Sequence, residues 1–146
     1  MIRLALICCL CALTAPALAA PLQQQAEDPQ ATAVAEAAFA ADLAEAQKVG
    51  SLTQVQGWSV DLDGDGAAEV VGHIYSLFLC GNFNCTFVLQ SDGQGGMRQL
   101  LFSQGMDAVE VLDSRTGGWR DLAVWRPDLM GGPATLVWSG SQYDLR

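Results

Sequence analysis

The segment Asp61–Val71, "DLDGDGAAEVV", places four carboxylates within nine residues, directly ahead of a β-branched apolar run. The apolar run predicts a β-strand, and the glycines allow a sharp turn before it. Carboxylates that converge without a cation repel one another. The crowding therefore indicates a bound divalent cation or, as the simpler alternative, a tight turn whose aspartates bond nearby amides.

The spacing of these acidic residues suits calcium. Calcium takes roughly six to eight oxygen ligands at about 2.3–2.6 Å, so a short loop has to aim alternate side chains and a carbonyl at one point. The aspartates alternate, and a glutamate follows eight positions after the first of them. We expect calcium as the cofactor, with these ligands: Asp61, Asp63, Asp65, the carbonyl of Ala67, and Glu69.

The segment differs from the helix–loop–helix calcium motif. Gly72 stands at the twelfth place, where that motif needs a bidentate glutamate, and the flanks look like strands. Residues 61–72 instead resemble the FG-GAP repeats of integrin-like β-propellers and related bacterial exported proteins, whose loops read Asp-x-Asp-Gly-Asp-Gly-x-x-Asp before an apolar strand. The resemblance implies a structural calcium site, with Glu69 in the place of the commoner aspartate.

A degenerate second copy of the same frame lies at residues 113–124. Asp113 and Asp121 stand eight positions apart, with a glycine at the sixth place and an apolar run afterwards, and the copy begins 52 residues downstream of the first. That pitch is near the length of a propeller blade. Arg115 and Gly117 replace the second and third aspartates, so we expect a turn with local charge pairing and no calcium. Two frames are too few for a closed propeller.

The rest of the pattern predicts an α+β fold in which an N-terminal helix over 28–49 packs on a mainly antiparallel β-sheet or small β-sandwich over 55–146. Asp28 can cap the first free amides of the helix, and Gly50 can end it. Short β-rich runs separated by Gly, Asp and Ser then follow. The expected strands are 55–60, 69–79, 85–90, 97–103, 108–112, 119–125, 134–138 and 142–145. We expect one globular domain over 28–146.

The N-terminus predicts export. Residues 1–19 begin with a positive residue, Arg3, continue with an apolar stretch and end in Ala-Leu-Ala, the pattern of a cleaved signal peptide. The apolar stretch is too short to span a bilayer, so no membrane insertion is expected after cleavage. Residues 20–27, rich in Pro, Gln and Ala, read as a disordered linker. We expect the mature protein in a periplasm or the extracellular medium.

Two cysteines, Cys80 and Cys85, remain after signal removal. In an oxidising compartment such a pair predicts a disulfide, which would close "CGNFNC" into a rigid loop. Phe83 lies inside this loop, where an aromatic side chain can anchor a partner or fold back onto the sheet. The alternative function is therefore a secreted inhibitor or adhesion module that acts through the Cys80–Cys85 loop.

The composition argues against several functions. Sixteen acidic residues against seven basic ones disfavour nucleic acid and anionic lipid surfaces as partners. No nucleophile elbow or phosphate loop is present, and His73 is the single histidine, which we expect at an edge or surface. We therefore expect a non-enzymatic binding or interaction module, whose protein partner and oligomeric state the sequence leaves open.

Overall fold

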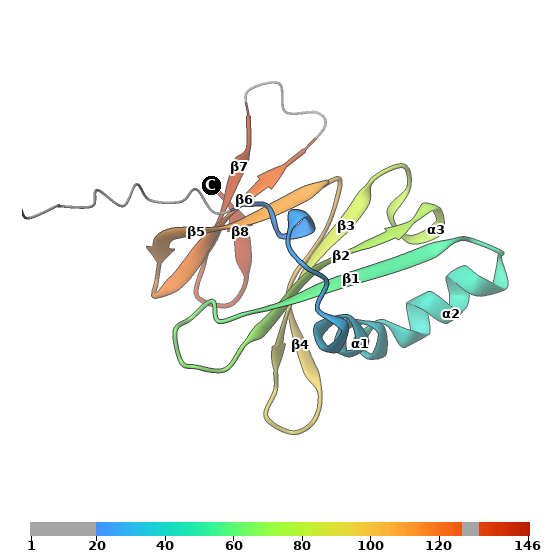
Figure 1. Ribbon diagram of the computed structural model, residues 1–146, viewed down its shortest axis with the longest axis horizontal. Coiled ribbons are helices and arrows are strands. Elements are labelled where there is room, and N and C mark those ends of the chain that lie inside the picture. Colours follow the sequence, from blue (N-terminus) through green and yellow to red (C-terminus); the bar gives the residue numbers. More distant parts are fainter. Residues whose placement is uncertain (1–19, 127–131) are drawn as a thin grey trace, which may run out of the picture.

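The described part of the chain contains two four-stranded antiparallel sheets, and in each the strands follow one another in chain order (Figure 1). The computed structural model describes residues 20–126 and 132–146. The first sheet contains β1 (Thr53–Val60), β2 (Glu69–Ser76), β3 (Asn84–Ser91) and β4 (Met97–Gln104). The second contains β5 (Ala108–Thr116), β6 (Trp119–Trp125), β7 (Ala134–Trp138) and β8 (Tyr143–Leu145). The mixed α+β class and the antiparallel pairing are confirmed.

The first sheet is buried on both faces. Figure 1 shows it between the helices and the second sheet. The apolar cluster on its helix side includes Ala31, Ala35, Phe39, Val55, Val70, Ile74, Cys80, Cys85, Phe87 and Leu89. The cluster against the second sheet includes Leu22, Trp58, Leu62, Val71, Val88, Leu100, Val109, Leu122, Leu136 and Tyr143. A strand buried on both faces reads as a continuous apolar run, which explains the sequence that follows the acidic segment.

The expected single helix is two helices, α1 (Pro29–Ala38) and α2 (Ala40–Lys48). Asp28 caps α1 as predicted, because its Oδ1 accepts hydrogen bonds from the amides of Gln30 and Ala31 at 3.1 and 3.0 Å. Phe39 interrupts the helical geometry, with φ −103° and ψ 14°. Its ring packs on Phe87 and Phe102 of the first sheet. Helical periodicity in the sequence cannot predict such a tertiary contact.

In the segment 20–27, expected to be a disordered linker, Leu22 packs into the apolar cluster between the two sheets. The segment contains a 3₁₀ turn, η1 (Leu22–Gln24), whose Leu22 is only 3% exposed. The carbonyl of Ala26 accepts a hydrogen bond of 3.2 Å from Nε1 of Trp58. Burial of one large apolar side chain thus fixes a segment whose composition alone reads as disordered. The predicted signal peptide, 1–19, lies outside the described residues.

The predicted strand 69–79 ends early, at Ser76, and a short helix, α3 (Leu77–Cys80), follows. Oγ of Ser76 accepts a hydrogen bond of 3.3 Å from the amide of Leu79 and so caps the turn. Cys80 and Cys85 form the expected disulfide, with their Cα atoms 5.4 Å apart. Among the described residues no helix is long and apolar enough to cross a membrane.

Candidate metal centre

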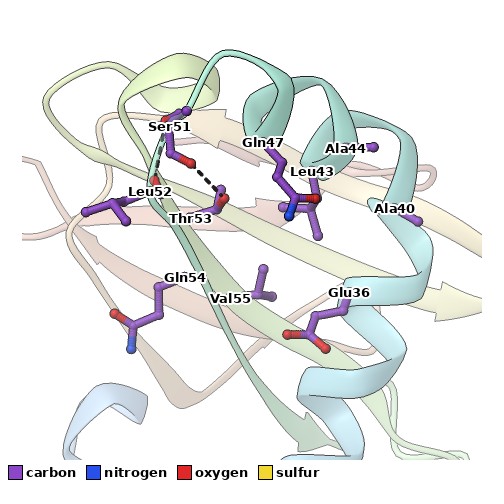
Figure 2. Close-up of a pocket in the computed structure, with 11 residues that line it drawn as sticks. Glu36, Ala40, Leu43, Ala44, Gln47, Ser51, Leu52, Thr53, Gln54 and Val55 are labelled. Carbon is purple, nitrogen blue, oxygen red and sulfur yellow. Dashed lines mark hydrogen bonds between the residues drawn. The ribbon is translucent and has the colours of Figure 1, made fainter.

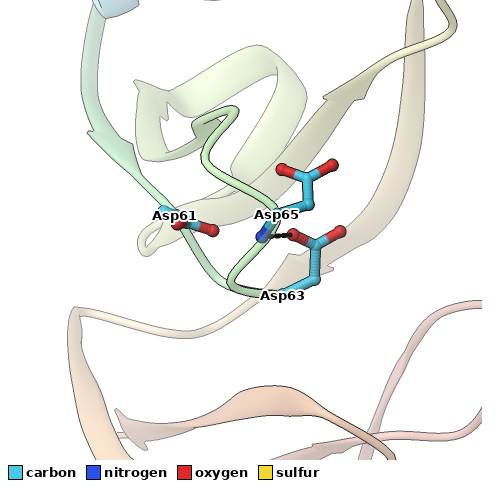
Figure 3. A group of neighbouring side chains, drawn as sticks. All are labelled: Asp61, Asp63 and Asp65. Carbon is cyan, nitrogen blue, oxygen red and sulfur yellow. Dashed lines mark hydrogen bonds between the residues drawn. The ribbon is translucent and has the colours of Figure 1, made fainter.

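The connection between β1 and β2 carries the acidic segment and brings three of its carboxylates together (Figure 3). One oxygen from each of Asp61, Asp63 and Asp65 lies within 4.8 Å of the others. Two oxygens on one calcium ion stand at most about twice the bond length apart, or about 5 Å. The three carboxylates are therefore close enough to hold one metal ion, and calcium stays a prediction.

The backbone of the loop turns at Gly64 and Gly66, whose φ angles are +82° and +90°. Both amides donate to the first carboxylate: Gly64 bonds Oδ1 of Asp61 at 2.7 Å, and Gly66 bonds Oδ2 at 3.2 Å. A side chain at either glycine would be strained in this left-handed conformation. The glycines therefore do the turning that the sequence predicts for them.

The other two aspartates bond amides further along the loop. Oδ1 of Asp63 accepts from the amide of Asp65 at 3.0 Å, and Oδ1 of Asp65 accepts from the amide of Ala67 at 2.7 Å. These are the bonds of a tight turn. They leave lone pairs on the same carboxylates, because each carboxylate has about four acceptor sites. The carbonyl of Ala67 as a ligand stays a prediction.

Glu69 lies outside the group of three. It is 2% exposed, its Oε2 accepts a hydrogen bond of 2.9 Å from the amide of Leu62, and its Oε1 accepts one of 3.2 Å from Nε2 of Gln90. Burial raises the pKa of Glu69, and the nearby carboxylate of Asp63 raises it further. Its role as a calcium ligand stays a prediction, whereas its role in holding the base of the loop is visible.

Leu62 joins the loop to the rest of the molecule. Its side chain is completely buried between the two sheets. Its carbonyl accepts hydrogen bonds from the amide of Arg120 at 2.8 Å and from Nη1 of Arg115 at 3.1 Å. The same Nη1 donates to the carbonyl of Gly118 at 2.6 Å. The acidic loop is thereby fixed to the hairpin between β5 and β6.

That hairpin is the place of the second, degenerate frame. Both frames thus occupy the junction between the first two strands of a four-stranded sheet. Nη2 of Arg120 pairs with Asp113 at 3.2 Å, the local charge pairing expected there. Oγ of Ser114 donates to Oδ2 of the buried Asp121 at 2.7 Å. The second place of each frame therefore bonds the ninth-place carboxylate, as Leu62 bonds Glu69.

His73 is buried, contrary to the expectation of an edge or surface position. It is 3% exposed, because η1 and the neighbouring strands cover its side of the sheet. Its Nδ1 pairs with Oγ1 of Thr86 at 2.9 Å, and its Nε2 contacts Gln23. Burial lowers the pKa of His73 to about 4, so the ring is neutral at neutral pH. The local sequence does not predict the burial of His73, because Gln23, which covers the ring, is 50 positions away.

The loop closed by the disulfide stands at one end of the first sheet. Phe83 is 45% exposed there, and two neighbours on α3, Leu77 and Phe78, are 58% and 52% exposed. Phe83 therefore does not fold fully back onto the sheet. Exposed apolar side chains thus lie both in this loop and on the short helix before it, whereas the sequence proposed Phe83 alone.

Comparison with models of known protein families, with curated proteins and with solved structures found no match to this chain.

Proposed function

We propose that this protein is an exported, non-enzymatic domain that binds one calcium ion in the Asp61–Glu69 loop and uses it to hold its two sheets together while the domain binds a protein partner. The observation that carries the proposal is the approach of the Asp61, Asp63 and Asp65 oxygens to within 4.8 Å of one another. Among the described residues none of the three has an ion-pair partner.

Anchoring of the loop gives the proposed ion a structural role. The loop base is held by Leu62, whose side chain is in the core between the sheets and whose carbonyl bonds Arg115 and Arg120 of the second sheet. A bound cation would offset the repulsion among the three carboxylates. It would so stabilise the β1–β2 loop, which is hydrogen-bonded to the second sheet. Binding to the native state alone stabilises that state.

Calorimetric titration of the mature protein with calcium chloride tests the proposal. We expect one site, and at a calcium concentration about 100 times the Kd a stabilisation of about 2.7 kcal/mol. For a domain of this size that is a rise in Tm of roughly 10 °C. A sample in chelator that melts at the same temperature as one in excess calcium contradicts the proposal.

Asparagine substitutions separate ion binding from turn formation. Asp63→Asn and Asp65→Asn keep an oxygen for the turn hydrogen bond but lose charge, so both should weaken calcium binding. Asp92→Asn is the matched control, because Oδ1 of Asp92 bonds the amides of Gln94 and Gly96 at 2.8 Å in a similar turn outside the acidic group. This control should leave the calcium affinity unchanged.

A second candidate function is an inhibitor or adhesion module that acts through the Cys80–Cys85 loop. The exposed Phe83, Leu77 and Phe78 at one end of the sheet favour it. Pull-down with the mature protein and with Phe83→Ala tests it. Loss of one specific partner on Phe83→Ala supports this candidate, whereas an unchanged set of partners contradicts it.

A further inference from the structure

A groove of about 770 Å³ runs between α2 and the outer edge of β1, and its lining residues are shown in Figure 2. β1 is an edge strand, since it pairs with β2 and with no other strand of its sheet. Leu43 and Val55 face the groove from opposite sides, beside small alanines of α2. The volume falls in the range of roughly 300–1,000 Å³ that is usual for ligand sites.

The edge of β1 is closed along part of its length by α1. Oγ1 of Thr32 accepts the amide of Gly57 at 3.0 Å, and Oδ2 of Asp28 accepts the amide of Ser59 at 3.1 Å. The approach is close: a Cβ on Gly57 would lie 2.9 Å from the backbone of Ala31. These two amides therefore point away from β2, toward the outer edge.

The remaining part of the edge is open. In an antiparallel strand the backbone N–H and C=O groups of successive residues point alternately toward the partner strand and away from it. Because the amides of Gly57 and Ser59 point away from β2, the amides of Thr53 and Val55 point away from it as well. Within 20–126 and 132–146, no side chain accepts their amides as Thr32 and Asp28 accept those of Gly57 and Ser59. Both residues line the groove, in which Thr53 is partly exposed and Val55 is 9% exposed.

One end of the groove is acidic. Glu36 is the charged residue of the lining, and its carboxylate extends from α1 toward β1 in Figure 2. Glu36 forms no ion pair with another residue of the part of the chain that the structure describes. At the other end Leu52 is 83% exposed. The groove thus combines unpaired backbone groups, an apolar floor and one acidic group.

We propose that the groove binds an extended peptide segment of a partner protein, which adds a short strand to β1 at Thr53–Val55. Alternate side chains of such a strand point to opposite faces. One face would set an apolar side chain against Leu43 and a lysine or arginine beside Glu36. Strand addition at a free sheet edge takes affinity from backbone hydrogen bonds and specificity from pockets for alternate side chains.

The backbone requirement decides against other occupants. A small apolar molecule would leave the amides of Thr53 and Val55 without acceptors. A second copy pairing edge to edge would place two copies of Glu36 near one interface, on a chain with a formal net charge of −9. A basic, extended segment satisfies both the amides and the carboxylate. The site is separate from the acidic loop and from Phe83, and it stands whether or not the loop binds calcium.

Selection of a random displayed peptide library on the mature protein, with calcium present, tests the proposal. We expect peptides that alternate apolar residues and carry a lysine or arginine. Addition of the synthetic peptide should slow hydrogen exchange at the amides of Thr53 and Val55, but not at those of Gly57 and Ser59. Methylation of the peptide's central backbone amides should abolish binding, a result that does not depend on any change in the protein.

Two variants locate the site. Thr53→Pro removes an outward amide without touching the ladder to β2, a position where an edge strand tolerates proline, and should abolish binding while the Tm shows that the fold persists. Glu36→Gln should weaken binding about tenfold, whereas its matched control Glu45→Gln, whose carboxylate already pairs with Lys48 at the surface, should not.

The proposal is overturned if the selection recovers nothing above the level of an unrelated protein. Peptides that bind Thr53→Pro as well as the wild type also overturn it. A concentration-dependent dimer that Thr53→Pro dissolves would assign the edge to a second copy and overturn the peptide as its occupant.

Discussion

The backbone amide of Leu62 donates to Oε2 of Glu69 over 2.9 Å, and both residues are almost fully removed from water, at 0% and 2% exposed. The second and ninth places of the acidic frame are thus bonded inside the core. The aspartates between them stay near the surface, where a cation can reach them. Glu69 therefore titrates in a buried environment that the sequence spacing does not reveal.

The buried carboxyl gives the first prediction. Burial raises the pKa of Glu69 above its ordinary 4.5, so the native state holds this proton at pH values where the unfolded chain has released it. The contribution to stability is complete below pH 4.5 and is lost as the pH rises through the native pKa. In calcium-free buffer the free energy of unfolding of the wild type, relative to that of Glu69→Gln, should fall as the pH rises above 4.5.

Denaturant unfolding at several pH values measures this difference. Glu45→Gln, an exposed substitution with the same change in charge, should follow the wild type across the range. Calcium should reduce this loss of stability, because a cation beside Asp63 would offset the negative charge that helps to raise the pKa of Glu69. Parallel curves for the wild type and Glu69→Gln would show that Glu69 does not titrate in this way.

His73 contributes with the opposite sign, and it is the second prediction. Burial lowers its pKa from 6.5 to about 4, so between these pH values the ring is protonated in the unfolded chain and neutral in the native state. The stability is complete above pH 6.5 and declines as the pH falls toward about 4, by about 3 kcal/mol over the window. His73→Gln should flatten this decline, as acid titration of the unfolding free energy can show. An equally steep acid limb in the variant would assign the decline to other groups.

The extent to which the sequence predicts the fold depends on how local each determinant is. All eight strands are foreseen, because Gly, Asp and Ser between them mark turns through their own backbone preferences. The run Leu77–Leu79 reads as strand but forms a helical turn, since Ser76 caps it and Cys80 is tied to Cys85. Division into two sheets, left open as one sheet or a small sandwich, depends on non-local packing and has no signature in any single segment.

The candidate site shows the same division. Asp61, Asp63 and Asp65 converge as their spacing predicts, because a short glycine-containing loop leaves few other directions for them. The inward placement of Glu69 follows from the amide of Leu62 and from Gln90 on the neighbouring strand β3, which is 21 positions away along the chain, so spacing alone could not show it. The burial of His73 likewise depends on η1, 50 positions away.

Gly72 gives the third prediction, because a side chain there has no room. A Cβ at this position would lie 2.2 Å from the carbonyl oxygen of Gln56 and 2.4 Å from Cζ of Phe87. Gly72→Ala should cost about 1–3 kcal/mol of stability through displacement of both neighbours, measured as a lower denaturant midpoint. In the background of Phe87→Leu, Gly72→Ala should cost less stability than it does in the wild type, because the clash with the ring is relieved. The clash with the carbonyl of Gln56 remains. Strict additivity of the two substitutions would contradict the predicted contact.

The disulfide gives the fourth prediction. The bond closes a loop of six residues, Cys80–Cys85. By lowering the conformational entropy of the unfolded chain, it should stabilise the native state by about 2 kcal/mol. Reductant should lower the unfolding free energy of the wild type by this amount and leave the double variant Cys80→Ala, Cys85→Ala unaffected. If Phe83 acts as a partner anchor, the same reductant should weaken partner binding more than it lowers stability, because an unconstrained loop has to be ordered on binding. Equal sensitivity of the wild type and the double variant to reductant would show that the bond does not stabilise the fold.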